Sequence, residues 1–226
     1  MTTSVACVIP ALNAAPTLGA VVSELRRALP GAYVIVIDDG SVDDTSGVGA
    51  RVADATLRFP RNRGKGAALR AGFAVARERH ADFVVTVDAD GQHDPAFAPA
   101  LVDALASADL AIGARDSRAR VMPVGRRLTN RLSAAAVSRC IGRPVVDAQS
   151  GFRAVRADVL SDVAPRGDRY EFETAFLIIA AQQGHRIVFV PIPTTYSGLV
   201  PSQFRPVRDS ARIVGTLWRF ALGARA

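Results

Sequence analysis

The sequence predicts an α/β fold in which helices cover both faces of a Rossmann-like, doubly wound and mostly parallel sheet. Short runs of β-branched and aromatic residues alternate with longer stretches whose apolar residues recur at helical spacing, an order typical of strand–helix–strand units. Two of the short runs lead directly into paired carboxylates and a glycine. Open α/β sheets place ligand sites at the carboxyl ends of their strands, so this pattern also indicates where a site would lie.

Four short apolar runs predict the strands of the first half, because turn residues bound them and they are too short for helices. Their ranges are 5–9, 33–37, 55–59 and 83–87. Helices are predicted between them, beginning near Ala15, Asp43 and Gly64. The first of these helices has the clearest apolar face, formed by Leu18, Val21, Val22, Leu25 and Leu29.

The second half is less regular. We expect a helix over 94–105, a strand over 110–113, an arginine-rich helical region over 117–143, a polar loop over 147–153, a helix over 171–183 and a strand over 187–190. The segment 205–220 mixes Trp218 and aliphatic residues with arginines, as helices at membrane surfaces do. We therefore predict one domain over 1–204 and a C-terminal amphipathic helix over 205–226, either packed on the domain or lying at a membrane surface.

The charge balance is strongly basic, with a net charge of +7 and a sequence pI of about 10.6. Of the 28 basic residues, only Lys65 is a lysine. This balance favours anionic partners such as nucleotides or phospholipid head groups. Aromatic and basic residues are not interleaved as in proteins that bind single-stranded nucleic acid, so we expect no nucleic-acid partner.

The apolar runs also bear on location. No run approaches the ~18 apolar residues of a membrane-spanning helix, and the first apolar segment does not resemble a signal peptide. Cys7 and Cys140 lie far apart without metal-like spacing, which indicates reduced thiols. We therefore expect a cytoplasmic protein, at the inner face of the cytoplasmic membrane if its substrate is a lipid.

Asp88 and Asp90 follow the fourth apolar run. Because they are two residues apart, both would point to one face of a continuing strand. Two hard oxygen donors suit Mg²⁺ or Mn²⁺, which keep waters and take further ligands from a phosphorylated substrate. Asp and Gly are also ordinary turn residues, and the pair alone leaves both interpretations open.

The stretch Gly64-Lys65-Gly66 is not a P-loop, which needs a glycine five residues before the Gly-Lys pair and a Ser or Thr after it. Phe59 and Gly66 occupy those places. A glycine-rich helix start with a cation can still lie beside a phosphate or a nucleotide. A tightly packed helix start explains the same residues, and both interpretations stay open.

Five motifs in this order resemble the inverting family-two glycosyltransferases with a GT-A fold. More narrowly, they resemble the dolichol-phosphate mannose synthase group, the polyprenyl-phosphate hexosyltransferases. The resemblance covers about 5–202, nearly the whole chain. The motifs are Ile9-Pro10-Ala11-Leu12-Asn13, Asp38-Asp39-Gly40-Ser41, Asn62-Arg63-Gly64-Lys65-Gly66, Asp88-Ala89-Asp90-Gly91-Gln92-His93 and Asp147 with Ser150-Gly151-Phe152-Arg153.

The resemblance implies a metal-dependent enzyme that moves a hexose from a nucleotide-diphosphate sugar, of the GDP-mannose or UDP-glucose type, to a polyprenyl phosphate. It implies that Mg²⁺ or Mn²⁺ bridges the diphosphate and neutralises charge on the departing group. The implied metal ligands are Asp88, Asp90 and Gln92. The implied nucleotide-sugar site consists of Pro10, Leu12, Asn13, Asp39, Lys65, Asp88, Ala89 and Asp90.

A polyprenyl phosphate brings its own ionised nucleophile, so the reaction needs aligned cations more than a strong base. The resemblance places Arg115 at the acceptor phosphate, with Arg126 and Arg153 as further candidates. Asp147 would orient the sugar, act as the base for a hydroxyl acceptor, or cap its loop. The implied catalytic residues are Asp90, Arg115 and Asp147.

Other functions stay open. The acceptor can be a hydroxyl of a lipid, polysaccharide or small molecule, or the chain can bind anions or membranes without catalysis. The motifs also depart from the family: Ala14 stands where relatives often carry Glu, Leu12 replaces an aromatic residue, and Gln203 replaces a late lysine. Arg205 or Arg208 would have to supply that charge. The departures leave the donor sugar open, and the sequence does not indicate an oligomeric state.

Overall fold

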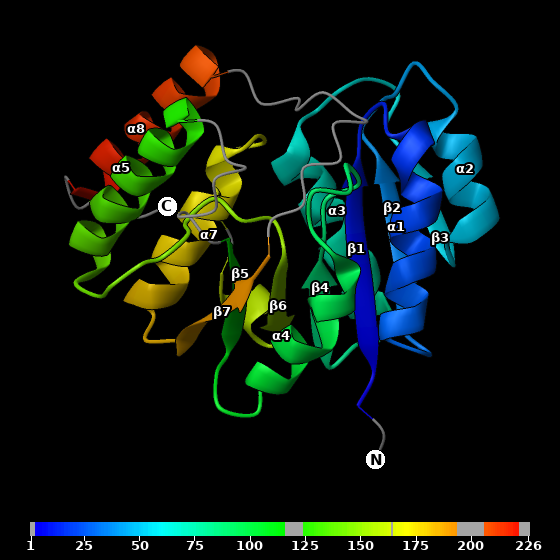
Figure 1. The fold of residues 1–226 in the computed structure, drawn as a ribbon, viewed down its shortest axis with the longest axis horizontal. Coiled ribbons are helices and arrows are strands. Elements are labelled where there is room, and N and C mark those ends of the chain that lie inside the picture. Colours follow the sequence, from blue (N-terminus) through cyan, green and yellow to red (C-terminus); the bar gives the residue numbers. More distant parts are fainter. Residues whose placement is uncertain (1–2, 116–123, 164, 194–205, 222–226) are drawn as a thin grey trace.

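A seven-stranded sheet with helices on both faces forms the centre of the computed structural model (Figure 1). The structure describes residues 3–115, 124–163, 165–193 and 206–221. The strand order is β3-β2-β1-β4-β6-β5-β7, and β6 runs antiparallel to its neighbours β4 and β5 while the other pairs are parallel. The strands are β1 (Val5–Ala11), β2 (Tyr33–Asp38), β3 (Ala55–Arg58), β4 (Phe83–Thr86), β5 (Leu110–Arg115), β6 (Arg153–Arg156) and β7 (Ile187–Ile192).

The helices divide between the two faces of the sheet. Helices α1, α2 and α4 pack on one face, whereas α3, α5, α6 and α7 pack on the other. Helix α8 contacts α5 and α7, and Figure 1 shows these three helices together at the β5–β7 side of the sheet. The helices are α1 (Ala15–Ala28), α2 (Thr45–Val52), α3 (Lys65–Glu78), the 3₁₀ turn η1 (Pro95–Phe97), α4 (Ala98–Ala104), α5 (Val124–Ile141), α6 (Val159–Asp162), α7 (Glu171–Gln182) and α8 (Pro206–Ala221).

The central strands are buried on both faces, which explains why they read as continuous apolar runs. In β1, Ala6 and Val8 belong to the core on the α3–α7 side, and Cys7 and Ile9 belong to the core on the α1–α4 side. Successive side chains of a strand point to opposite faces, so one run of residues serves both cores. The predicted α/β fold class is therefore confirmed.

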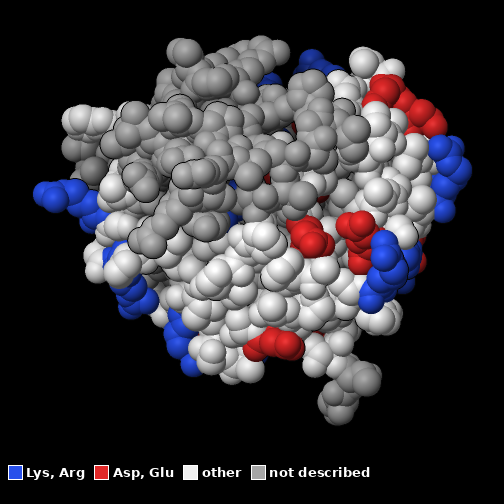
Figure 2. Space-filling view, viewed as in Figure 1, with Lys and Arg blue, Asp and Glu red and all other residues white. Residues whose placement is uncertain are grey.

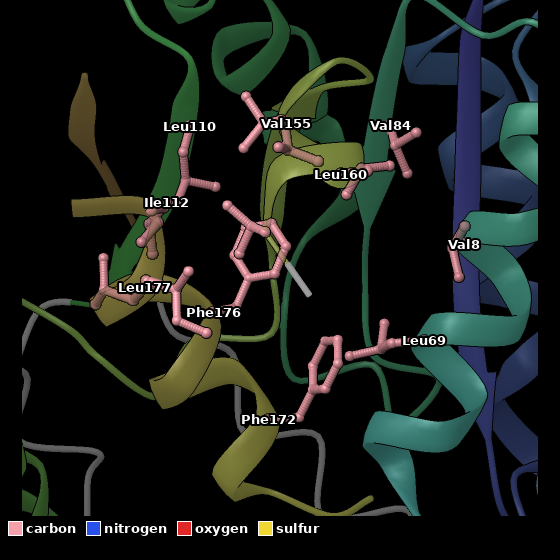
Figure 3. Packing of buried hydrophobic residues seen from close by; sticks show 14 of the residues in the cluster. Val8, Leu69, Val84, Leu110, Ile112, Val155, Leu160, Phe172, Phe176 and Leu177 are labelled. Carbon is pink, nitrogen blue, oxygen red and sulfur yellow. The ribbon is translucent and has the colours of Figure 1, made fainter. Parts of the chain in front are cut away.

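Helix α7 packs six buried residues into the core on the α3–α7 side: Phe172, Phe176, Leu177, Ile178, Ile179 and Ala180. Its residues Phe172 and Phe176 lie between Leu69 of α3 and the strand residues Ile112 and Val155 (Figure 3). Phe172 is almost fully buried, and the two rings are 6.3 Å apart. This packing fixes the first turn of α7 against the first turn of α3, and both turns contribute charged side chains to the site described below.

The predicted elements differ from the structure in several places, among them α6, which was not predicted, and β1, which continues to Ala11. Strand β6 was not predicted: the predicted loop over 147–153 ends at its first residue, and its four residues begin and end with arginine and form no apolar run. Strand β4 ends at Thr86, so Asp88 lies in the following loop and not on a strand. The region 94–105 is split into η1 and α4, each with a proline in its first turn. Strands β5 and β7 each extend two residues further than predicted.

The C-terminal segment forms α8, which packs on the rest of the chain through one face. Ile213 and Thr216 are buried, whereas Val214 and Trp218 are 51% and 64% exposed. Within the described ranges, no helix has the length and apolarity to span a bilayer. On the face drawn in Figure 2, the described charged side chains along the left edge are basic, whereas acidic and basic side chains lie together on the right.

Candidate active site

The site lies beyond the carboxyl ends of β1 and β4. Strand β1 has β2 on one side and β4 on the other, and all three are parallel. The chain therefore builds the sheet outward in both directions from β1, so the carboxyl edge of β1 and β4 is a topological switch point, where α/β proteins bind ligands. The predicted nucleotide residue Pro10 lies near the end of β1, Leu12 and Asn13 follow that strand, and the carboxylates Asp88 and Asp90 follow β4.

Asn13 joins the loops after β1 and β2. Its backbone N–H donates to Ser41 Oγ at 2.9 Å, and its side-chain Oδ1 accepts from the N–H of Val42 at 2.9 Å. Its φ is 50°, a left-handed conformation that asparagine tolerates better than most residues. Leu12 is half-buried in the same loop, and Pro10 is half-buried near the end of β1. The structure thus brings the predicted base-and-ribose residues of these two loops together.

Asp39 fixes the loop that leads into α3. Its Oδ1 accepts from the N–H of Arg63 at 2.6 Å, and its Oδ2 accepts from the N–H of Gly64 at 2.9 Å. Burial raises the pKa of Asp39 above its usual value, against the lowering effect of these hydrogen bonds. Gly40 beside it has a φ of +76°, and a Cβ there would lie 2.5 Å from the backbone of Arg61. A direct contact of Asp39 with a nucleotide stays a prediction.

The glycines around Lys65 allow α3 to pack tightly. Gly64 has a φ of +104°, and a Cβ there would overlap the carbonyl oxygen of Asp168. A Cβ on Gly66 would lie 2.7 Å from Cβ of Phe172. The N–H of Ala67 in the first turn donates to the Asp168 carbonyl at 3.2 Å. Of the two interpretations of this motif, tight packing is the one that these contacts support.

Lys65 connects α3 with the loop after β4 and with α7. Its ammonium Nζ lies 2.6 Å from Oδ1 of Asp88 and 3.0 Å from Oε1 of Glu173. The ring of Tyr170 is 5.8 Å from the same nitrogen. Burial lowers the pKa of Lys65, but the two carboxylates raise it by more, so the side chain stays charged. Glu173 is not among the predicted site residues, and this ion pair brings it to the site.

The carboxylates of Asp88 and Asp90 influence each other. Burial raises the pKa of Asp88 and Lys65 lowers it, with a net shift below the usual value. Burial and the charge of Asp88 together raise the pKa of Asp90. Two partly buried carboxylates that repel each other attract a cation. Their oxygen atoms are donors of the kind that Mg²⁺ and Mn²⁺ bind. Among the described residues, no three His, Cys, Asp or Glu side chains are grouped to hold a metal ion.

The loop that carries these carboxylates is held from both sides. Oδ1 of Asp90 accepts from the N–H of Gln92 at 3.0 Å. The carbonyl of Ala89 accepts from Oγ1 of Thr17 in α1 at 2.6 Å. His93 is buried against Phe152, with the rings 5.7 Å apart, and burial lowers the pKa of His93 to about 4. A neutral imidazole therefore supports the end of this loop.

Arg115 and Asp147 form a buried ion pair at the end of β5. Nε of Arg115 donates to Oδ2 at 2.7 Å, and Nη2 donates to Oδ1 at 3.0 Å. Burial raises the pKa of Asp147, but Arg115 lowers it by more, so the pKa lies below its usual value. The structure thus brings these two predicted residues together. Arg126 lies in the first turn of α5, and its side chain is outside the described part of the structure.

The buried side chain of Arg153 donates hydrogen bonds to three backbone carbonyls. Its Nε, Nη1 and Nη2 donate to the carbonyls of Ser150, Glu173 and Ala148 at 2.8, 2.9 and 3.1 Å. Burial lowers the pKa of Arg153, although nearby carboxylates partly offset this effect. These bonds tie the loop before β6 to the first turn of α7. Arg153 therefore supports the backbone of this loop. Its predicted contact with an acceptor phosphate stays a prediction.

Gly151 lets this loop pass close to the ion pairs. A Cβ there would lie 2.6 Å from both Oδ2 of Asp88 and Nζ of Lys65. The carbonyl of Gly151 accepts from Oγ1 of Thr86 at the end of β4 at 2.8 Å. Any larger residue would therefore displace the charged groups of Asp88 and Lys65.

Comparisons with known proteins agree with this geometry. The family described as glycosyl transferase family 2 matches residues 6–164. The chain belongs to this family. It is 34% identical to the undecaprenyl-phosphate mannosyltransferase of Micrococcus luteus, covering 96% of this chain and 94% of the relative. It is also 34% identical to the polyprenol monophosphomannose synthase of Mycolicibacterium smegmatis, covering 83% and 76%.

The fold of this glycosyltransferase is also found in solved structures. Glucosyl-3-phosphoglycerate synthase from Mycobacterium tuberculosis, crystallised with Mn²⁺, UDP and glucosyl-3-phosphoglycerate, superposes with a TM-score of 0.78 at 22% identity. The match covers 99% of this chain and 81% of that chain. The predicted family and GT-A fold are therefore confirmed.

Sequence reasoning missed several residues of the glycosyltransferase site. Glu173 and Thr17 contact site residues from α7 and α1, and nothing in their local sequence marks them. Gly151 belongs to the fifth motif of the sequence analysis, but its close approach to Asp88 and Lys65 was not predicted. Thr86 could not be found, because threonine is common in buried strands.

Proposed function

We propose that this glycosyltransferase moves a hexose from a nucleoside diphosphate sugar to a polyprenyl phosphate at a membrane surface, with the help of Mg²⁺ or Mn²⁺. The names of the two relatives support the lipid phosphate as the acceptor and mannose as one candidate sugar. The complex of the fold neighbour with Mn²⁺ and UDP supports a divalent cation beside a nucleoside diphosphate. A GDP- or UDP-linked hexose is the donor class that we propose.

The ion pair of Arg115 and Asp147 is the observation that favours a phosphate acceptor. A hydroxyl acceptor needs a general base, and Asp147 was the candidate for that role. Both carboxylate oxygens of Asp147 accept from Arg115, and the pKa of Asp147 is lowered, so it is a poor base near neutral pH. A phosphate acceptor is already ionised and needs a cation to align it. Arg115, held by Asp147, is suited to that task.

Asp88, Asp90 and Gln92 fit the donor side of this reaction. The two carboxylates repel each other, and a divalent cation between them would relieve the repulsion that raises the pKa of Asp90. Gln92 would add an amide oxygen, and the diphosphate would complete the ligands. When bound, the cation would neutralise charge on the departing nucleoside diphosphate. Asn13 and Asp39 would hold the base and ribose, with Pro10, Leu12, Lys65 and Ala89 around them.

In the transfer itself, a phosphate oxygen of the acceptor attacks the anomeric carbon as the bond to the nucleoside diphosphate breaks. Arg115 pairs with the acceptor phosphate and keeps it in line with the departing group. Asp147 holds the guanidinium of Arg115 in place and takes up no proton. Arg126 is a further candidate for the same phosphate, and we assign Arg153 to the support of the loop.

The exposed face of α8 is the surface that we propose for the membrane. Val214 and Trp218 are one helical turn apart, and both are more than half exposed. Arg212 and Arg219 flank them. Tryptophan and aliphatic residues beside arginines are typical of helices that lie at an anionic bilayer, where each arginine adds ~1 kcal/mol of binding. This surface would bring the site to a lipid acceptor.

The deciding experiment offers purified chain a panel of GDP- and UDP-sugars with polyprenyl phosphate or the matching unphosphorylated polyprenol. We expect one donor to give a glycolipid product with polyprenyl phosphate and none with polyprenol. A chelator of divalent cations, or the substitution Asp90→Ala, should abolish formation of this product. Transfer to the polyprenol would instead support a hydroxyl acceptor. In parallel, donor at about 100 times its dissociation constant should add about 2.7 kcal/mol of stability in a thermal-shift assay. No shift with any nucleotide would leave only the non-catalytic alternative.

A further inference from the structure

Lys65 is paired with two carboxylates that belong to different parts of the site. Asp88, at 2.6 Å, lies in the loop after β4 and is one of the proposed metal ligands. Glu173, at 3.0 Å, lies in the first turn of α7 and is 5% exposed. The ammonium therefore already supplies a positive charge at the carboxylate to which a divalent cation would bind.

An ammonium and a divalent cation compete for Asp88. Both are attracted by the same carboxylate, and they repel each other at short range. A buried lysine that simply left Asp88 would lose its partner, which is costly in a low-dielectric site. Glu173 removes this cost because it offers Lys65 a second carboxylate, which is more deeply buried than that of Asp88.

A hydrogen bond and the packing of its neighbour fix the position of Glu173. Its backbone carbonyl accepts from Nη1 of Arg153, and the neighbouring Phe172 is packed in the core. The loop at Gly151 also closes over the ammonium, since a Cβ there would lie 2.6 Å from Nζ. The ammonium is thus confined between Asp88 and Glu173 and has little room to move elsewhere.

We propose that Lys65 occupies the cation position at Asp88 while the site is empty, and that Glu173 takes over the ammonium when Asp88 binds a divalent cation. This inference rests on the proposed function, which supplies the cation. Lys65 and Glu173 are then positioning residues that set the affinity of the site for metal. The exchange keeps both Lys65 and Asp88 paired with an opposite charge in both states.

The test measures the affinity for Mn²⁺ by titration calorimetry, in the presence of saturating UDP or GDP. We expect Glu173→Gln to weaken Mn²⁺ binding about tenfold, because Lys65 loses its alternative partner and stays on Asp88. A tenfold change in affinity is typical of two coupled binding equilibria. The double variant Lys65→Met with Glu173→Gln removes both charges, and its affinity should return to within about threefold of the wild-type value.

A matched control comes from the same helical turn. Glu171 is also buried, and its Oε1 accepts from the backbone N–H of Arg169, a bond that the amide oxygen of Gln can keep. Glu171→Gln should leave the Mn²⁺ affinity within about twofold of wild type, although it removes the same charge from α7. Circular dichroism and the melting temperature without metal establish that each variant is folded.

A second readout uses the fact that Lys65 is the single lysine of the chain. Labelling with ¹⁵N-lysine gives one side-chain ammonium signal, and diamagnetic Mg²⁺ with UDP or GDP should shift it as the contact with Asp88 is lost. If the wild-type chain binds Mn²⁺ and Glu173→Gln binds it equally well, this inference is overturned and the proposed function is not. The same holds if the Lys65 signal does not move. A wild-type chain that binds no Mn²⁺ would overturn both this inference and the metal dependence of the proposed function.

Discussion

The guanidinium of Arg115 and the carboxylate of Asp147 face each other with two hydrogen bonds, of 2.7 and 3.0 Å. The sequence analysis gave these residues separate tasks at the acceptor. In the structure, the bidentate pair makes them one unit, because such geometry fixes the plane of the guanidinium. The same pair lowers the pKa of Asp147, so the carboxylate is suited to hold the arginine and unsuited to accept a proton.

Asp147→Asn should impair use of the acceptor while leaving use of the donor nearly intact. Asparagine keeps the size of the side chain but loses the charge that holds Arg115, and breaking such a buried pair costs about 3 kcal/mol. We expect kcat/KM for polyprenyl phosphate to fall about 100-fold, with the KM for the donor within about twofold of wild type. Steady-state kinetics with each substrate varied in turn measures both values. Equal losses for donor and acceptor would contradict this role.

The same pair makes the stability depend on pH in a defined range. The pKa of Asp147 is lowered in the folded state from a reference value of 3.8, so its contribution to the free energy of unfolding is complete above about pH 4. It is lost as the pH falls through the folded-state pKa. Urea unfolding of wild type and Asp147→Asn should therefore show a constant difference between about pH 6 and 8 that shrinks below about pH 4. A difference that already shrinks between pH 7 and 5 would contradict this assignment.

Gly151→Ala should disturb Asp88 and Lys65 directly. The added methyl would lie 2.6 Å from a charged atom of each, so at least one must move. We expect activity to fall about 100-fold and Mn²⁺ binding to weaken, with a loss of stability of about 1–3 kcal/mol from overpacking. Gly19→Ala in α1 is the matched control, because the nearest atom to its added Cβ would be 4.0 Å away. The control should keep full activity and a melting temperature equal to or above wild type.

The fold could be predicted from the sequence because the central strands are apolar on both faces. Residues 83–86 are one such run, and the polar residues that follow marked the edge where the site lies. Strand β6 could not be predicted, since Arg153 sits in a buried position by bonding three carbonyls that only the tertiary structure supplies. A short strand with a charged residue at each end has no periodic signal.

The site was predictable to the extent that its residues form local motifs. Asp88, Asp90 and Asn13 were found in this way, and the structure brings their loops together at the β1–β4 edge. The partners of Lys65 could not be found, because Glu173 is far away in the sequence and its position follows from the packing of α7 on α3. The pairing of Arg115 with Asp147 likewise depends on the sheet, which places β5 beside the loop before β6.

Arg153→Lys should reduce stability more than it reduces acceptor use. Lysine keeps the charge but has one nitrogen where Arg153 uses three to hold the carbonyls of Ala148, Ser150 and Glu173. Leaving buried carbonyls without donors costs about 1–3 kcal/mol each, so we expect a loss of at least 2 kcal/mol. Thermal unfolding measures this loss. A large rise in the KM for polyprenyl phosphate at unchanged stability would show instead that Arg153 binds the acceptor, as the sequence analysis predicted.

Trp218→Ser should weaken binding to membranes without changing the active site. Trp218 is 64% exposed on α8, so its removal costs little stability, whereas its insertion into an interface would contribute about 1–2 kcal/mol. We expect about tenfold weaker binding to anionic vesicles in a flotation assay, with kcat/KM on a short-chain, water-soluble polyprenyl phosphate unchanged. Leu57→Ser is the matched control, because Leu57 is an exposed apolar residue on β3, at the end of the sheet opposite α8 (Figure 1). If both variants bind vesicles as wild type does, the exposed face of α8 is not the membrane surface; if both bind equally weakly, the contact is not specific to α8.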